Sequence, residues 1–544
     1  MSNPHYDNDY DSDVAVHSDS EQSKVPTSVG IDPSVLSFIT HFYNAYRSNN
    51  NPELQRCYTM KFSALSKRHF AKSTWPAAEE IASLVNNDEF FLILYKELYF
   101  RHIYANSQPT LEQSIGSYDN YVNLFNFITQ AETPITTDIP IQWLWDMVDE
   151  LIYQFGKYVA YRRSPTKPIP AADVERIHAN PHVWDVKIII SLFQYLVQQS
   201  NINEILIAAS NDQDESEVAG EFGSILLYRN LGYFSLIGLL RINCLLGDFH
   251  YALEMVKNIQ FSKTAFYNRI IPCRVSLFYH VGFCQVMLRR YSEAASTFTD
   301  ILFFITKADL QHMPHYLQDA IHKNSAQMVT LLAICVTLCP PRYALDEAIA
   351  KDLSSFSPPS LPPSLLGPPF LSKVFEEWFK NASPRFITYI LPTPEQAMAA
   401  MASKQVEVSI PQRMFMRDIR QQLLVPKVRS YLRLYTSLTI SKLASFLEAD
   451  ESEVRSYLLN YKHKTRSTQG STVSYSDVDF HVIDDIVHIS EVKPAANHSQ
   501  YFLRQISSLD EQLLSVNINT TTLRAGAGAA NGSQGSSSSH GNRH

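Results

Sequence analysis

The sequence predicts a mostly α-helical protein: a tetratricopeptide-like solenoid of helical repeats that ends in a winged helix with a small β wing, followed by a C-terminal helix. Three observations predict this fold. Apolar residues recur at helical spacing along most of the 544 residues, and two helical hairpins alternate large and small residues as repeat stacks do. The apolar period changes from about 3.6 to about 2 only near the C-terminus. A chain of this length holds about three or four domains of ordinary size.

Composition limits the class of protein. Hydrophobic residues make up 45% of the chain and charged residues 18%, which is typical of a globular protein rather than a disordered or membrane-embedded one. No apolar run approaches the roughly 18 residues of a membrane span, and residues 1–30 are unlike a signal peptide. The six cysteines are scattered, which fits a reducing compartment. We therefore expect a cytosolic or nuclear protein, and its net charge of −8 gives no overall attraction to nucleic acid.

Two regions are expected before the repeats. Residues 1–27 are acidic and contain few apolar side chains, which predicts a disordered tail. Residues 28–220 are predicted to form an N-terminal helical domain. Within it, Phe90–Ala105 is apolar on nearly every side, which indicates a helix buried among other helices.

A second aromatic helix of this domain carries three carboxylates. Gln142–Phe155 is expected to pack through its tryptophans, and Asp146, Asp149 and Glu150 lie among them in the sequence. Such a group could suggest acid–base chemistry. Their helical spacing indicates instead that they cover a polar face of the helix.

Residues 221–425 are predicted to form a helical-repeat region, a type of fold that usually binds proteins. The best hairpin has Gly282 and Ala294 at the small positions, where they would let two helices approach closely. In the preceding hairpin Leu240 stands where Gly282 does, so this repeat is degenerate. Proline-rich residues 357–370 are predicted to form an extended loop that cannot be helical. Two helical segments, around residues 371–381 and 394–404, are expected to follow.

Residues 426–495 are predicted to form the winged helix. Three short apolar stripes at i, i+3, i+4 and i+7 predict three helices. These stripes are Val428, Tyr431, Leu432 and Tyr435; Ile440, Leu443, Ala444 and Leu447; and Val454, Tyr457, Leu458 and Tyr461. Thr439 is expected to cap the second helix, and Asp450 with Glu453 the third.

The wing is predicted from alternation. Val478, Phe480 and Val482 form one apolar series and Val487 with Ile489 another, around a turn at residues 484–485. This turn lacks the glycine that favours a type I′ hairpin, so the strand register stays open.

Residues 496–516 are predicted to form a C-terminal helix. Its apolar seam consists of Phe502, Ile506, Leu509 and Leu513, which suggests a bundle with partner chains or packing on the chain's own winged helix. Residues 517–544 are rich in glycine and serine, which predicts a disordered tail.

Motifs of catalysis are missing from the sequence. There is no phosphate-binding loop, no metal-ligand spacing of histidines or cysteines, and no nucleophile elbow. We therefore expect no catalytic, cofactor-binding or metal-binding residues, and no enzyme.

Nucleic-acid contact is the remaining chemistry. The residues that could contact RNA are Arg455, Lys462, Lys464 and Arg466, on or just after the third helix of the winged helix. Carboxylates at residues 448, 450, 451 and 453 crowd the end of this helix that usually meets base edges. Sequence-specific DNA binding is therefore disfavoured, and weak RNA contact stays open.

Several longer segments resemble a known family. They include Phe91–Tyr99 (FLILYKELY), Gln142–Asp146 (QWLWD) and Leu231–Leu236 (LGYFSL). Shorter matches continue at Tyr6–Tyr10, Met287–Tyr291, Lys462–Lys464 and Phe502–Ile506. With a helical repeat running into a winged helix, these segments resemble PCI-domain proteins, and among them the subunit L family of eukaryotic translation initiation factor 3.

The resemblance implies a function. It implies a non-catalytic scaffold subunit of initiation factor 3 that acts in binding the 40S ribosomal subunit and in assembly of the pre-initiation complex. The expected partners are PCI and MPN subunits, with subunit K as direct neighbour. The residues expected at the subunit interface are Val478, Phe480, Val482, Val487, Ile489, Phe502, Ile506, Leu509 and Leu513. The alternatives are a PCI scaffold of the proteasome-lid or signalosome type and a winged-helix factor that binds RNA or DNA.

Overall fold

The computed structural model describes most of the chain between residues 31 and 513. The described residues are 31–131, 133–162, 170–211, 213–261, 266–308, 315–338, 349–351, 353, 368–387, 409–422, 425–465, 467–469, 472–474, 478–491, 502, 505–506, 509 and 513. Contacts divide the chain into two compact units, each described by itself. Unit 1 is Met1–Met328 with Ser383–Glu407, and unit 2 is Val329–Ala382 with Val408–His544.

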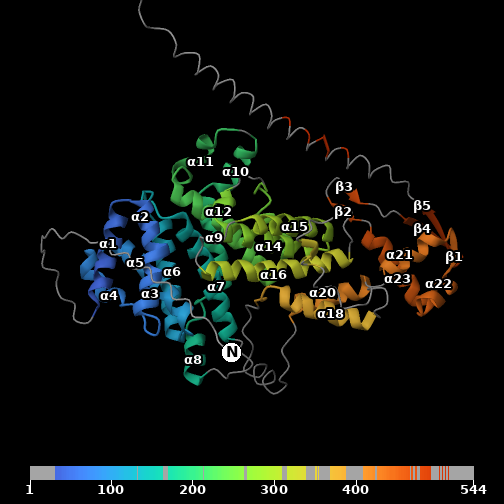
Figure 1. The fold of residues 1–544 in the computed structure, drawn as a ribbon, viewed down its shortest axis with the longest axis horizontal. Coiled ribbons are helices and arrows are strands. Elements are labelled where there is room, and N and C mark those ends of the chain that lie inside the picture. Colours follow the sequence, from blue (N-terminus) through green and yellow to red (C-terminus); the bar gives the residue numbers. More distant parts are fainter. Residues whose placement is uncertain are drawn as a thin grey trace, which may run out of the picture. The chain divides into compact units, whose positions relative to one another are not determined.

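The described part of unit 1 is helical (Figure 1). Its first half contains α1 (Pro33–Arg47), α2 (Asn51–Arg56), η1 (Cys57–Lys61), α3 (Phe62–His69), α4 (Ala78–Ile81), η2 (Ala82–Val85), α5 (Glu89–Asn106), α6 (Leu111–Thr129), α7 (Ile141–Arg162), α8 (Ala171–Ala179) and α9 (Val186–Gln199). Its second half contains α10 (Ile202–Ser210), α11 (Glu215–Gly223), α12 (Leu226–Leu246), α13 (Phe249–Met255), η3 (Phe266–Arg269), α14 (Ile271–Met287) and α15 (Tyr291–Lys307). α16 (His315–Leu338) begins in unit 1 and ends in unit 2.

The aromatic helices α5 and α7 lie inside unit 1, as predicted. Trp143 of α7 stacks between Phe42 of α1 and Tyr58 of η1, with ring centroids 5.7 and 5.0 Å away. Phe91 of α5 meets the same Phe42 edge-on at 5.6 Å. These large side chains bury more apolar surface per residue than aliphatic ones do, so they form the main part of this core.

Helix α12 is buried at nearly every position and packs against α7 and α9. The N-terminal helices and the first repeat hairpin therefore share one core across residue 220. Within the described residues, no single helix is long and apolar enough to span a membrane. α11 and α12 meet that criterion only together, with a 96° bend between them.

The repeat hairpins are α12 with α13 and α14 with α15. Gly282 of α14 faces the ring of Phe298 on α15, and a Cβ at residue 282 would lie 2.5 Å from that ring. Ala294 is fully buried beside it in the core. The predicted close approach of these two helices is confirmed, and Phe298 is the side chain that fills the space left by the glycine. Leu240 of the degenerate repeat is also fully buried.

Unit 2 contains the winged helix. Its described elements are α18 (Pro368–Ala382), α20 (Ile410–Gln422), α21 (Val425–Leu434), β1 (Ser437–Thr439), α22 (Ile440–Leu447), α23 (Glu451–Thr465), β2 (Ser467–Gln469), β3 (Thr472–Ser474), β4 (Val478–Ile483) and β5 (Ile486–Glu491). The three predicted helical stripes converge on one core, in which Leu432 and Leu443 are fully buried. Thr439 caps α22 by accepting a hydrogen bond from the backbone N–H of Lys442, as predicted. The fold class predicted from the sequence is confirmed.

The sheet of the wing has the order β1-β5-β4, with both pairs antiparallel. β4 and β5 pair through a two-residue turn, with Ile483 opposite Ile486. Asp484 and Asp485 have φ of 48° and 64°, so two aspartates adopt the left-handed conformation that a type I′ turn needs. Aspartate tolerates this region better than most residues with a Cβ.

Several predictions about loops need correction or lie outside the described residues. The proline-rich loop was expected to extend to residue 370, but α18 already begins at Pro368. Proline is tolerated in the first turn of a helix because the backbone N–H groups there have no intrahelical partner. The helix expected near residues 394–404 and both terminal tails lie outside the described residues. The polar run before the wing contains β2 and β3, which pair with each other.

Candidate functional site

The wing was predicted to offer apolar side chains to a partner. Val478, Phe480 and Val487 are instead buried to 4% exposure or less, because they point into the winged helix's own core. Ile489 packs against the same core, and contact of a partner with these four residues stays a prediction. The apolar side chains that the wing does expose are Val482 and Ile483, at 42% and 54%.

β4 is an edge strand of the wing sheet, but the middle of its edge is occupied. The backbone N–H of Phe480 donates to Asp479 Oδ1 at 2.9 Å, and its carbonyl accepts from Lys462 Nζ at 2.6 Å. The same ammonium lies 3.4 Å from Asp479 Oδ1. A charged side chain at an edge commonly prevents unwanted strand pairing. Among the described residues of β4, only those around Val482 therefore leave the strand edge open for pairing with another strand.

The four predicted RNA-contact residues are not equally available. Arg455 forms an ion pair with Asp485 of the wing turn, and Lys462 is bound at the β4 edge. The side chain of Lys464 and the whole of Arg466 lie outside the described residues. Two of the four cations are thus partly neutralised by the protein itself, which weakens phosphate binding through them.

The predicted C-terminal seam is exposed. Ile506, Leu509 and Leu513 are in helical conformation with exposures of 53%, 55% and 59%, and Phe502 has 59%. Apolar side chains repeated at this spacing form one stripe along a helix. The sequence also left open that this seam packs on the chain's own winged helix. Such packing would bury these side chains.

The carboxylates of α7 share one face of the helix, as their spacing predicts, but this face is only partly exposed to solvent. Asp146 accepts hydrogen bonds from Tyr58 and from Gln142, and Arg101 Nη1 lies 3.7 Å away. Burial raises the pKa of Asp146 to about 6 and that of Glu150 to about 7, and the nearby Arg101 offsets only part of this. The side chain of Asp149 is 48% exposed and pairs with Arg241.

The buried partners of these carboxylates come from α5. The side chain of Glu97 is fully buried, binds Arg101, and accepts from Trp143 Nε1 at 3.0 Å. The network is closed on itself, because each buried charge has a charged or hydrogen-bonding partner. It therefore has the features of a structural network rather than of a catalytic site.

One group of side chains has the types and proximity of a metal site. His41, Glu53 and Cys57 place their ligand atoms within 4.8 Å of one another. However, Glu53 Oε1 already receives Lys61 Nζ at 2.7 Å and His41 Nε2 at 2.8 Å. The ammonium of Lys61 thus already supplies a positive charge beside Glu53. Burial also raises the pKa of the Cys57 thiol, which disfavours the thiolate form that binds a metal.

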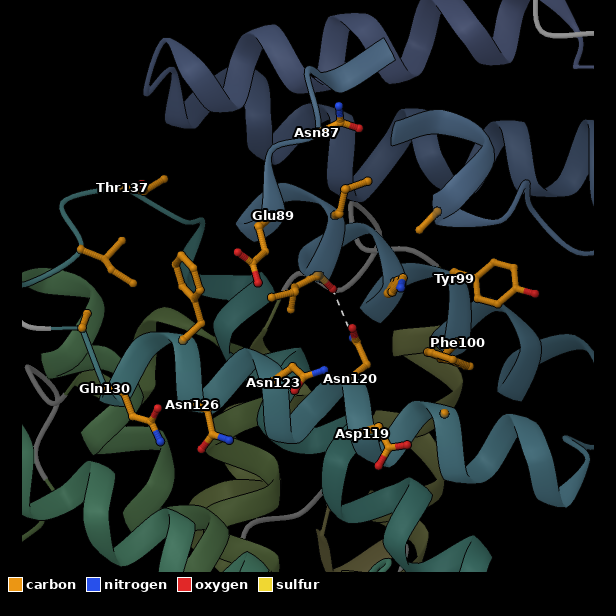
Figure 2. A pocket seen from close by; sticks show the side chains of 18 of the residues that line it. Asn87, Glu89, Tyr99, Phe100, Asp119, Asn120, Asn123, Asn126, Gln130 and Thr137 are labelled. Atoms are coloured by element: carbon orange, nitrogen blue, oxygen red, sulfur yellow. Dashed lines mark hydrogen bonds between the residues drawn. The ribbon is translucent and has the colours of Figure 1, made fainter. Parts of the chain in front are cut away.

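An open groove lies in unit 1, between α5 and α6 (Figure 2). Its volume is about 1390 Å³, and it is bordered by the starts of α4 and α5 on one side and by residues 131 and 133–137 on the other. Amide side chains dominate its polar lining, at Asn87, Asn120, Asn123, Asn126 and Gln130. Sequence analysis did not identify this groove, although the spacing of the amides on α6 was visible.

Comparisons with known proteins agree over most of the chain. A family model described as RNA polymerase I-associated factor PAF67 matches residues 113–509. Eukaryotic translation initiation factor 3 subunit L of Nematostella vectensis is 38% identical over 495 residues, covering 89% of this chain and 93% of that protein. The chain belongs to the subunit L family of eukaryotic translation initiation factor 3.

Other subunit L proteins match equally well. The protein of Danio rerio is 38% identical over 469 residues, covering 84% of this chain and 80% of the relative. That of Mycosarcoma maydis is 38% identical over 502 residues, covering 89% and 74%. The resemblance predicted from the sequence is confirmed, and in this subunit L family member the matched region includes α6, the repeat hairpins and the winged helix.

Proposed function

We propose that this chain is a non-catalytic scaffold subunit of translation initiation factor 3, working in the cytoplasm. In this role it helps the factor bind the 40S ribosomal subunit and assemble the pre-initiation complex. The relatives are subunits of this factor by name, which supports membership of a multi-subunit assembly. Its partners would be the PCI and MPN subunits of the factor, with subunit K as direct neighbour.

The exposed seam of the C-terminal segment carries this proposal. Ile506, Leu509 and Leu513 each keep more than half of their surface in water. Burying such side chains stabilises an interface by about 1.5–3 kcal/mol each. A helix with one apolar stripe joins a bundle of helices readily, so partner subunits would cover the seam. The free part of the β4 edge, with Val482 and Ile483, would supply a second contact.

Co-purification tests the scaffold role. We expect the variant Ile506→Asp/Leu509→Asp/Leu513→Asp to lose partner subunits, because three carboxylates cannot enter an apolar bundle. The matched control is Met60→Asp/Ile207→Asp/Leu226→Asp, which places the same charges at similarly exposed apolar positions in unit 1. Full retention of every partner by the seam variant would contradict the proposal.

RNA contact is the second candidate function, because basic residues lie on or just after α23. The observation that limits it is the internal binding of Arg455 and Lys462. We therefore expect weak binding of the isolated chain to single-stranded RNA that disappears as salt rises. Tight, sequence-selective binding in a salt titration would favour the RNA-binding alternative over the scaffold.

A further inference from the structure

We propose that the amide-lined groove between α5 and α6 binds an extended, basic segment of a partner protein. This surface lies in unit 1, outside the winged helix and the C-terminal seam. It is a docking site of its own, and the proposal does not depend on the scaffold role of unit 2.

The groove has the size and openness of a site for a polypeptide. Its volume of about 1390 Å³ exceeds the roughly 300–1,000 Å³ that pockets for small molecules have. It is open to solvent rather than enclosed. A small molecule would leave much of it filled with water, whereas an extended segment would follow it.

A row of exposed amides on α6 can recognise a peptide main chain. Asn123, Asn126 and Gln130 are exposed and lie at i, i+3 and i+7, so they share one face of the helix. No hydrogen bond joins their side chains to another described residue. Each amide offers both a donor and an acceptor, the pair that a peptide unit requires. Seven residues of helix rise about 10.5 Å, the length of roughly three residues of extended chain.

The floor and one end of the groove are held rigidly. Asn120 is buried and donates to the carbonyl of Ile93 on α5 at 3.2 Å. Gly116 lets α6 approach Phe100, since a Cβ there would lie 3.3 Å from that ring. Figure 2 shows Phe100 and Asn120 on the two facing helices. A site whose helices are fixed in this way loses little entropy when a segment binds.

The charges of the groove select a basic segment. Its lining contains Glu79, Glu89, Asp119 and Lys96 among the described residues. Lys96 is paired with Glu79 at 3.0 Å, and no cation of the described residues pairs with Glu89 or Asp119. Two carboxylates are thus left to attract lysine or arginine, and the same charges repel nucleic-acid phosphates.

Aromatic surface completes the site. Phe127 of α6 is 37% exposed and stacks on Phe90 of α5, with ring centroids 4.8 Å apart. Tyr99 and Phe100 line the other end. These rings can hold the aliphatic stems of long basic side chains while the charged ends reach the carboxylates.

Peptide capture by the full chain tests the proposal. The probe is an array of synthetic peptides of roughly twelve residues with randomised sequence, which are longer in extended form than the row of amides. We expect the captured peptides to be enriched in arginine and lysine, and their binding to weaken about tenfold or more in Asn123→Ala/Asn126→Ala/Gln130→Ala, which loses three pairs of hydrogen-bonding groups. Glu89→Gln/Asp119→Asn should remove the preference for basic peptides.

Matched controls separate the groove from the rest of the surface. Gln55→Ala/Gln198→Ala removes exposed amides elsewhere, and Glu175→Gln removes an exposed carboxylate of α8. Both should bind peptides like the parent chain, and unchanged circular dichroism would show that all variants fold. Failure to capture any basic peptide, or capture that the groove variants do not weaken, would overturn the proposal. Displacement of the peptide by oligouridylate would also overturn it, because RNA would then be the occupant. A change of oligomeric state in the groove variants would overturn it too, because a second copy of the chain would then be the occupant.

Discussion

Glu150 illustrates how a single partly buried carboxylate couples the protein to pH. Its pKa is raised to about 7 because burial disfavours the charged form, and its Oε1 accepts from Gln154 Nε2 at 3.0 Å. The folded state therefore keeps this proton at a pH where the unfolded chain has lost it. The contribution of Glu150 to stability is complete below about pH 4.5, the pKa of this group in the unfolded chain. It is lost as pH rises through about 7, the pKa in the folded protein.

We expect Glu150→Gln to become more stable than the parent chain as pH rises. Glutamine keeps the acceptor for Gln154 and cannot ionise, so the gain should grow between about pH 5 and 7 and then level off, on the order of 1–3 kcal/mol. Urea denaturation followed across this pH range measures it. Equal pH dependence of the two proteins would show that Glu150 ionises as freely in the folded state as in the unfolded one.

The α7 carboxylates also show where prediction of single residues fails. Their helical spacing was correct, but spacing does not reveal which face of the helix is covered. Arg101 and Glu97, which complete the network, lie on another helix, and only the fold brings them to Asp146. Gly282 was predictable because a repeat hairpin fixes which residues meet, and the structure places it against the ring of Phe298.

At the scale of elements, the β4 edge carries a testable consequence. Lys462 holds the carbonyl of Phe480 and lies beside Asp479, so it blocks the edge that another strand would use. We expect Lys462→Ala to destabilise the wing by about 1 kcal/mol and to promote self-association of the isolated chain. Sedimentation velocity over a range of concentrations measures the association.

Two variants make the result specific to the edge. Lys462→Arg keeps a cationic donor and should stay as monodisperse as the parent. Lys427→Ala removes an exposed lysine of α21 and tests whether loss of charge alone causes association. If Lys427→Ala associates as strongly as Lys462→Ala, net charge rather than the strand edge is responsible.

Elements long enough to show an apolar period were predictable from the sequence, and elements too short for a period were not. The helices α21, α22 and α23 follow from their apolar stripes, and β4 and β5 from alternation. β1 has only three residues, too few for a period, and exists because it pairs with β5. The side chains of the wing show a related limit: alternation indicates that one face is buried, but it does not show whether the core or a partner buries it.

At the scale of the whole chain, the two compact units have separate cores. The helical repeats of unit 1 pack around α12 and α14, and the winged helix of unit 2 around Leu432 and Leu443. A chain with several cores does not unfold in one cooperative step. Its units open with their own free energies, which hydrogen exchange can separate.

We therefore expect a core mutation in one unit to act on that unit first. Leu443→Ala in α22 and Leu277→Ala in α14 each remove a fully buried side chain, with a loss of about 2–5 kcal/mol. Amide hydrogen exchange of the full chain should speed up in α22 and α23 for the first variant and in α12 and α14 for the second. Faster exchange in α12 and α14 caused by Leu443→Ala would show instead that the two cores unfold together, in which case α16, which runs through both units, is the element that couples them.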